Sequence, residues 1–266
     1  MILGVIGCGK MAKAMVSGIY EQKPRLYSTL LVNDTDTQQA EAFVDLFSAQ
    51  NYDQLDLVRH SNVVLLTVKP HQVREVLNHT SSAWRPGQLL ISVAAGIKIG
   101  VIQSYLPSDV KVIRVMPNLP ALVGAGITAI AAGEEVEKED FVQVENLLSG
   151  LGKTVITDEK KMDAITAVSG SGPAYVMMVV ESMTEAAVQI GLDWDLARQL
   201  VLSTISGSIT MLEITGQHPA QLRNQVSSPG GTTIAAIKQL EEWGLRNAFY
   251  HAIEEAYQRS MQLGQE

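Results

Sequence analysis

The chain has 266 residues, 46% hydrophobic and 18% charged, the composition of a folded globular protein. Its formal net charge of −8 and scattered cationic residues argue against nucleic-acid binding. No apolar run approaches the roughly 20 residues that span a bilayer, and no basic-then-apolar leader follows Met1. The single cysteine, Cys8, has no disulfide partner within the chain. These features predict a cytoplasmic protein that binds neither membrane nor nucleic acid.

The first residues predict a buried strand that runs into a glycine-rich turn. Residues 2–6 are apolar, and Gly7, Gly9 and Ala12 follow at the spacing G-x-G-x-x-A. Here Gly7 would permit the tight turn, Gly9 would let phosphates approach the backbone, and Ala12 would let the next helix pack closely. An ordinary tight turn is the alternative interpretation. The turn's place between a strand and a helix favours a site for NAD(H) or NADP(H).

Further apolar runs alternate with segments of helical periodicity. Near-continuous apolar strands are typical of a parallel sheet that is covered on both faces. The chain therefore predicts an α/β fold with a Rossmann-like, doubly wound and mostly parallel sheet. The expected strands are residues 29–32, 63–68, 89–93, 110–115, 127–131 and 154–156, and the expected helices are residues 11–20, 36–48, 73–78 and 134–148.

Strand signals end near residue 158, so we expect a nucleotide-binding domain over 1–157 and an all-α domain over 158–266. The first expected helix begins near Pro173 and ends at Gly191, and the second begins at Asp193 or Asp195 and ends near Gly216. Two further helices are expected over residues 232–242 and 245–263. The helix over 174–190 is apolar on more than one face. Partners within its own domain are one explanation, but a homodimer is favoured.

Polar residues follow the second predicted strand. Asp34 lies 25 residues after Gly9, where an acid would hold the adenosine ribose of NAD and repel a 2′-phosphate. If Asn33 instead ends the strand, then Asn33, Thr35 and Thr37 offer hydrogen bonds to a phosphate. Capping of the next helix is a third role for Asp34. These residues leave the choice of cofactor open.

Three more strand ends are expected at the same edge of the sheet. Lys69 follows a buried strand and precedes Pro70, so it is predicted to bond a phosphate or ribose, with solvation as the plainer alternative. The small residues 94–96 would let a flat ring approach the backbone. Asn118 offers a donor and an acceptor after the next strand.

The segment 228–233 is the most informative part of the helical domain. Free N–H groups at the start of a helix can bind a carboxylate. Gly230 and Gly231 would let a ligand approach, and the hydroxyls of Thr232 and Thr233 would add donors. An ordinary capped helix start is the alternative for this segment alone.

Together these segments resemble the pyrroline-5-carboxylate reductase family, in the family's order and along the whole chain. The matching segments are residues 7–12, 68–70, 94–96, 114–118, 169–175 and 228–233. The resemblance implies a Rossmann domain, a helical dimerisation domain, NAD(P)H as reductant, and a dimer that often assembles into a ring of dimers. NADPH is favoured slightly, with NADH as the alternative, because the resemblance outweighs Asp34 alone.

The resemblance also implies a set of site residues. The loop Ser228-Pro-Gly-Gly231, with Thr232, would hold the substrate carboxylate, and Thr233 would bond the ring nitrogen. Glu159 matches a position near the substrate, and Gln54 one against the adenosine. The implied cofactor-binding residues are Gly7, Cys8, Gly9, Lys10, Met11, Ala12, Asn33, Asp34, Thr35, Gln54, Val68, Lys69, Pro70, Ala95, Gly96 and Asn118.

The chemistry agrees with reduction of L-1-pyrroline-5-carboxylate to L-proline, the last step of proline biosynthesis. A cyclic imine can take its proton from water, so no strong side-chain acid is needed. A hydroxyacid-type dehydrogenase, one alternative, usually needs a lysine or histidine to move the hydroxyl proton, and the chain has no lysine between Lys161 and Lys238. A non-catalytic nucleotide-sensing dimer is the other alternative.

Overall fold

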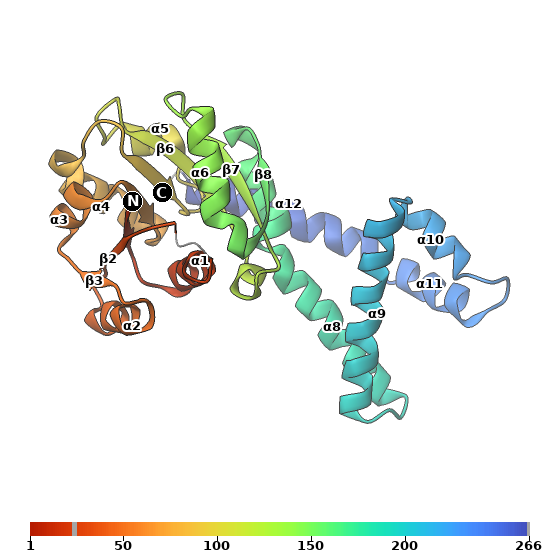
Figure 1. The fold of residues 1–266 in the computed structure, drawn as a ribbon. Coiled ribbons are helices and arrows are strands. Elements are labelled where there is room, and N and C mark those ends of the chain that lie inside the picture. The colour runs from red at the N-terminus through yellow and green to blue at the C-terminus, as the bar shows by residue number, and fades with distance from the viewer. Residues whose placement is uncertain (23–25, 265–266) are drawn as a thin grey trace. The chain divides into compact units, whose positions relative to one another are not determined.

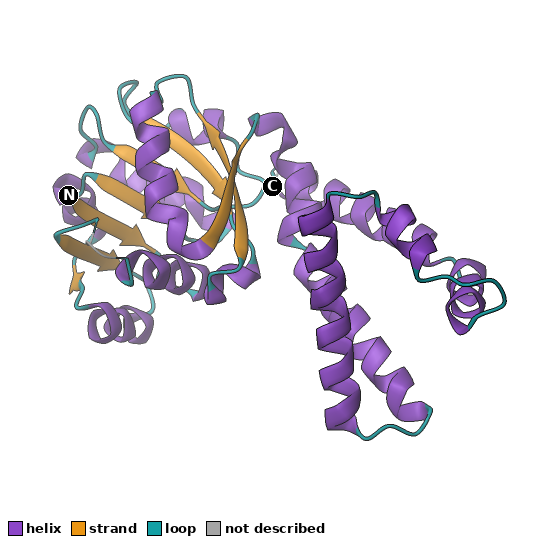
Figure 2. Cartoon of the chain, turned by 45° about the vertical axis from the view of Figure 1, so that its right-hand side comes forward, coloured by secondary structure: helices purple, strands orange, loops and turns teal. Residues whose placement is uncertain are grey.

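The computed structural model describes residues 1–22 and 26–264. The chain forms two compact units. The sheet unit comprises Met1–Pro173 together with the chain from Glu255 onward, and the helical unit comprises Ala174–Glu254. Figure 1 labels the elements in chain order, and Figure 2 distinguishes helices from strands by colour.

The sheet unit contains an eight-stranded sheet in the order β3-β2-β1-β4-β5-β6-β7-β8. All neighbouring strands are parallel except β6 and β7. The mostly parallel, doubly wound sheet is therefore confirmed. The strands are β1 (Ile2–Ile6), β2 (Thr29–Asn33), β3 (Gln50–Asn51), β4 (Val63–Leu66), β5 (Leu89–Ser92), β6 (Lys111–Met116), β7 (Gly126–Ala132) and β8 (Gly152–Ile156).

Helices cover both faces of the sheet (Figure 2), and buried side chains form two hydrophobic cores. Met15, Phe43 and Leu147, from α1, α2 and α6, lie in one core. Leu57 and Val73, from α3 and α4, lie in the other. The helices of this unit are α1 (Lys10–Tyr20), α2 (Thr37–Phe47), α3 (Gln54–His60), α4 (Pro70–Thr80), α5 (Ile99–Gln103), α6 (Lys138–Leu148) and α7 (Met162–Ile165).

Short elements account for most differences from the sequence prediction in this unit. The two residues of β3 are exposed and carry no apolar pattern, and α3 has only seven residues. The start of α3 depends on Asp53, whose carboxylate accepts hydrogen bonds from the N–H groups of Leu55 and Asp56. The predicted helix over 134–148 begins only at Lys138, because the Asp140 carboxylate bonds the N–H of Glu137 at its start.

The long helices of the remaining chain agree with the prediction. They are α8 (Gly172–Gln189), α9 (Trp194–Thr215), α11 (Thr232–Glu242) and α12 (Leu245–Leu263), with the short, unpredicted α10 (Pro219–Gln225) among them. Asp193, and not Asp195, caps α9, because its carboxylate accepts from the N–H of Leu196 at 2.9 Å. Gly216 ends α9 with a φ of 61°.

The start of α8 at Gly172 agrees with the helix start expected near Pro173. The chain is already helical from Met162, and a π-helical turn over Thr166–Gly170 leads towards α8. The sequence analysis did not predict α7 or this π-helical turn. A Cβ on Gly170 would lie 2.8 Å from the Cε of Met116, which is the far end of a flexible side chain and can move aside.

The sheet ends at Ile156, next to the boundary expected after residue 157. The compact sheet unit continues to Pro173. Met162, at the start of α7, is fully buried in the second core and holds this segment to the sheet. The chain rejoins the same unit from Glu255, within α12.

Gly18 of α1 packs directly against the backbone of Gly150, and a Cβ on Gly150 would overlap the carbonyl oxygen of Gly18. We expect Gly150→Ala to lower the free energy of unfolding by about 1–3 kcal/mol, because the helix must move away from the chain. Gly100→Ala is the control, since a Cβ on Gly100 meets nothing within 4 Å. Thermal and denaturant unfolding of both variants measure the effect, and equal stability of the two would contradict this packing argument.

Candidate functional site

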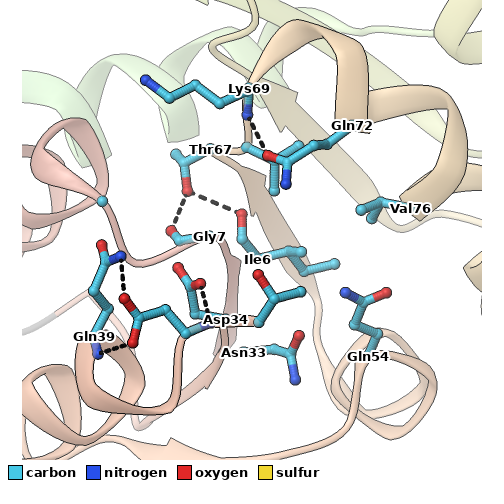
Figure 3. Close-up of a pocket in the computed structure, with 14 residues that line it drawn as sticks. Ile6, Gly7, Asn33, Asp34, Gln39, Gln54, Thr67, Lys69, Gln72 and Val76 are labelled. Atoms are coloured by element: carbon cyan, nitrogen blue, oxygen red, sulfur yellow. Dashed lines mark hydrogen bonds between the residues drawn. The ribbon is translucent and has the colours of Figure 1, made fainter.

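A cavity of about 230 Å³ opens in the sheet unit where β1, β2 and β4 end (Figure 3). It brings together eight of the residues predicted to bind a cofactor, which are Gly7, Gly9, Asn33, Asp34, Thr35, Gln54, Val68 and Lys69. Asn33, Asp34 and Gln54 also line an adjoining hollow with Asp53 and Glu75. The parallel strands thus gather side chains from separate parts of the sequence at one edge of the sheet.

The glycine-rich turn forms the floor of this cavity. Gly7 has a φ of 96°, and a Cβ there would lie 2.9 Å from the backbone of Thr67, so both conformation and space require glycine. A Cβ on Gly9, by contrast, would meet nothing within 4 Å. The packing of the protein therefore does not require glycine at position 9, whereas close approach of a ligand would.

The start of α1 is open to an anion. Gly9 stands at its N-cap position, and no side chain of the described residues caps the helix there. The N–H groups of Lys10, Met11 and Ala12 are thus the uncapped donors of the first turn. These donors and the helix dipole suit the pyrophosphate of a dinucleotide.

The Asp34 carboxylate is fixed by two backbone donors. Its Oδ2 accepts from the N–H of Cys8 at 2.5 Å, and its Oδ1 accepts from the N–H of Asp36 at 2.8 Å. Asp36, and not Asp34, caps α2 by accepting from Gln38 and Gln39. Asp34 therefore joins the glycine-rich turn to the loop after β2.

Opposite charges line the same cavity. The hydrogen bond from the Gln39 side chain lowers the pKa of the Asp36 carboxyl, which supports a negative charge beside that of Asp34. Lys69 is the cation among the residues that line the cavity. The backbone N–H of Lys69 donates to Oε1 of Gln72 at 3.1 Å (Figure 3).

The cavity also contains residues that the sequence analysis did not identify. These are Ile6, Asp36, Gln39, Thr67, Gln72 and Val76. Thr67 directly precedes the predicted Val68, and its hydroxyl donates to the carbonyl oxygen of Gly7 at 2.6 Å. Gln72 was missed because the helix was expected to begin at residue 73, whereas Pro70 opens α4. A proline just before a helical pattern was the available signal.

Some predicted residues lie outside the lining of this cavity. Ala95 and Gly96 follow β5, and Gly96 has a φ of 77°. Asn118 follows β6 and is 8% exposed. Its side-chain Oδ1 accepts a hydrogen bond from the N–H of Ile127 at 3.0 Å and so holds the start of β7. Glu159 accepts from the N–H of Ile99 at 2.6 Å. The remaining residues outside the lining are Cys8, Lys10, Met11, Ala12 and Pro70.

The helical unit contains the other candidate site, at the start of α11. Gly230 has a φ of 69°, and the N–H of Gly231 donates to the carbonyl of Ser228 at 3.1 Å. Gly231 is the N-cap residue, and no side chain of the described residues caps α11. The N–H groups of Thr232 and Thr233 are therefore uncapped donors beside two glycines, a chemistry suited to a carboxylate.

Comparisons with known proteins show the family to which the chain belongs. Residues 159–263 match the model for pyrroline-5-carboxylate reductase dimerisation, and residues 2–96 match the model for NADP oxidoreductase, coenzyme F420-dependent. A pyrroline-5-carboxylate reductase from Synechocystis is 39% identical over 264 residues, 98% of each chain. The chain belongs to the pyrroline-5-carboxylate reductase family. It is an NAD(P)H-dependent oxidoreductase.

Solved structures support the membership of the pyrroline-5-carboxylate reductase family. The enzyme of Plasmodium falciparum, with NADP bound, gives a TM-score of 0.89 at 31% identity, over 99% of this chain and 98% of that one. The enzyme of Streptococcus pyogenes gives a TM-score of 0.90 at 29% identity, over 98% of each chain.

Within residues 1–22 and 26–264, none of the helices has the length and apolar character needed to cross a bilayer.

Cys8 provides a test of the closed packing below the glycine-rich turn. Burial, and secondly the charge of Asp34, raise the pKa of its thiol to about 12. The folded state therefore favours the neutral thiol. This preference contributes fully to the free energy of unfolding below pH 9.0, the ordinary pKa of a thiol, and the contribution is lost as the pH rises towards 12. At pH 8 we expect DTNB to react with Cys8 at least tenfold more slowly in the native protein than in denaturant. Equal rates would contradict the burial.

Proposed function

We propose that this member of the pyrroline-5-carboxylate reductase family reduces L-1-pyrroline-5-carboxylate to L-proline with NAD(P)H, as the last step of proline biosynthesis. The observation that carries the proposal is the open glycine-rich turn at the uncapped start of α1, within a cavity at the carboxyl ends of the strands. The named relatives and the matching dimerisation domain supply the substrate class.

We propose one orientation for the cofactor in this cavity, taken from the residues that line it. The N–H groups of Lys10, Met11 and Ala12 would bind the pyrophosphate, close to Gly7, Cys8 and Gly9. Asn33, Asp34, Thr35 and Gln54 would contact the adenosine, since they line the cavity and the adjoining hollow. Val68, Lys69 and Pro70 would lie along the dinucleotide, and Ala95, Gly96 and Asn118 would contact the nicotinamide.

The substrate carboxylate would bind the loop of Ser228, Gly230 and Gly231, with the N–H groups of Thr232 and Thr233. The hydroxyl of Thr233 would bond the ring nitrogen and orient its proton, which the imine can take from water. When bound, NAD(P)H supplies the hydride. Holding the two reactants in contact contributes up to roughly 7–11 kcal/mol in well-oriented cases. Glu159 remains a candidate near the substrate, although its carboxylate already accepts from Ile99.

We further propose that the helical unit forms a homodimer and that dimers associate into a ring. Few side chains of Ala174–Glu254 are buried within one chain, and many large apolar ones are exposed, far more than an isolated unit normally leaves in water. The exposed side chains include Met177, Met178, Ile190, Leu200, Ile214, Leu240 and Trp243.

A cytoplasmic location is proposed from the single, buried Cys8.

Thr233→Val tests the substrate site. We expect kcat/KM for pyrroline-5-carboxylate to fall by about 10²-fold, as for the loss of one polar donor in an active site, while NAD(P)H affinity stays constant. Proline, the product, should bind more weakly by about 1 kcal/mol. Thr233→Ser keeps the hydroxyl and should retain most activity. NAD(P)H absorbance at 340 nm and proline titration measure these effects, and wild-type values in the valine variant would exclude Thr233.

Asp34→Asn tests the role of the loop after β2 in cofactor choice. The amide oxygen can still accept from the N–H of Cys8, but the negative charge beside the adenosine ribose is removed. We expect the ratio of kcat/KM for NADPH to that for NADH to rise about tenfold, equivalent to about 1.4 kcal/mol. Asp45→Asn, on the exposed side of α2, is the control for charge. An unchanged ratio in Asp34→Asn would contradict this role.

A further inference from the structure

Arg114 is a charged residue buried in the sheet unit, only 2% exposed. It lies on β6, and its Nη1 is 3.4 Å from Oε1 of Glu159. Its Nη2 is 3.8 Å from Oδ1 of Asp163. A guanidinium is costly to bury unless carboxylates surround it, and here both carboxylates come from the segment that follows the sheet.

Glu159 connects Arg114 to the start of α5. The same Oε1 accepts from the N–H of Ile99 at 2.6 Å. Ile99 is the first residue of α5, and Lys98, at the N-cap position, provides no side-chain cap. Glu159 therefore satisfies an N–H group that the local sequence leaves open. This bond fixes the end of the turn that runs from Ala94 to Lys98.

Asp163 connects Arg114 to the last part of α12, which belongs to the same compact unit. Its Oδ1 accepts from the Oγ of Ser260, which is 2% exposed, at 2.8 Å. Beyond Ser260, the chain passes against Gly96. A Cβ on Gly96 would lie 2.7 Å from the nitrogen of Gly264, and one on Gly264 would overlap the carbonyl oxygen of Gly96. The two backbones are in direct contact.

We propose that Ser260 of α12 and Gly264, which directly follows this helix, are positioning residues for the turn over Ala94–Lys98. Gly264 packs on Gly96, and Ser260 donates to Asp163 beside Arg114, whose other neighbour, Glu159, bonds the end of the turn at Ile99. The proposal rests on the proposed function, in which Ala95 and Gly96 contact the nicotinamide. Gly96 has a left-handed φ of 77°, and such a glycine turn keeps one shape only when its surroundings restrain it. Small errors in the placement of reacting groups have large effects on rate.

Two variants loosen this arrangement without removing the buried charge. Gly264→Ala separates the chain end from Gly96, and Ser260→Ala removes the hydrogen bond to Asp163. Gly100→Ala and Ser104→Ala are the matched controls, because a Cβ on Gly100 meets nothing within 4 Å and the exposed Ser104 donates only to the carbonyl of Val101. All four are made in the full-length protein.

We expect kcat for pyrroline-5-carboxylate to fall at least tenfold in Gly264→Ala and Ser260→Ala, with a change below threefold in the Kd of NAD(P)H measured by its fluorescence. The controls should keep wild-type kcat. Amide hydrogen exchange over residues 94–99 should become at least tenfold faster in both test variants. If the test variants have a lower Tm but unchanged kcat and unchanged hydrogen exchange at the turn, these contacts only stabilise the fold. That result would overturn the proposal.

The exchange measurement separates this proposal from the proposed function. A wild-type protein that does not oxidise NAD(P)H with pyrroline-5-carboxylate overturns the function. In that case unchanged exchange over residues 94–99 in the test variants overturns the positioning role as well, and faster exchange supports it. An active wild type with unaffected variants overturns the positioning role alone.

Discussion

The register of three parallel strands determines the cofactor cavity. Ile6 of β1 pairs with Asn33 of β2 and with Leu66 of β4. Each strand ends there, so the residues that follow must lie side by side. Two backbone hydrogen bonds extend the pairing into the loops. The N–H of Gly7 donates to the carbonyl oxygen of Asn33 at 2.8 Å, and the N–H of Thr67 donates to that of Ile6 at 2.9 Å. A shift of one residue in any strand would turn its side chains to the opposite face and disperse the site.

The same chemistry recurs at the two candidate sites. Both α1 and α11 begin at a glycine N-cap, and no described side chain caps either helix. Relative to glycine, a serine or aspartate at the N-cap would stabilise each helix by about a few tenths of a kcal/mol. Glycine gives up that stability and leaves backbone donors for a ligand. By contrast, the side chains of Asp36 and Asp53 cap α2 and α3.

Much of the fold and of the cofactor cavity could be predicted because their signals are local. Continuous apolar runs marked the strands, and the glycine spacing marked the turn. The order of strands in a parallel sheet then brought Asp34 and Lys69 to the same edge. Contacts that depend on tertiary packing had no local signal. Nothing around Glu159 indicates that it bonds Ile99, and nothing around Gly264 indicates a contact with Gly96. Elements as short as β3 and α3 carry too few residues for a periodic pattern.

The helix α12 shows how the two units are connected. Its first part belongs to the helical unit, and from Glu255 it belongs to the sheet unit. The helical unit has too few buried side chains to be stabilised mainly by its own core, so association with a second copy is expected to stabilise it. The last turns of α12 instead pack through Ser260 and Gly264 in the sheet unit. One continuous helix thus has its first part in the unit with many exposed apolar side chains and its last turns against Gly96 of the sheet unit.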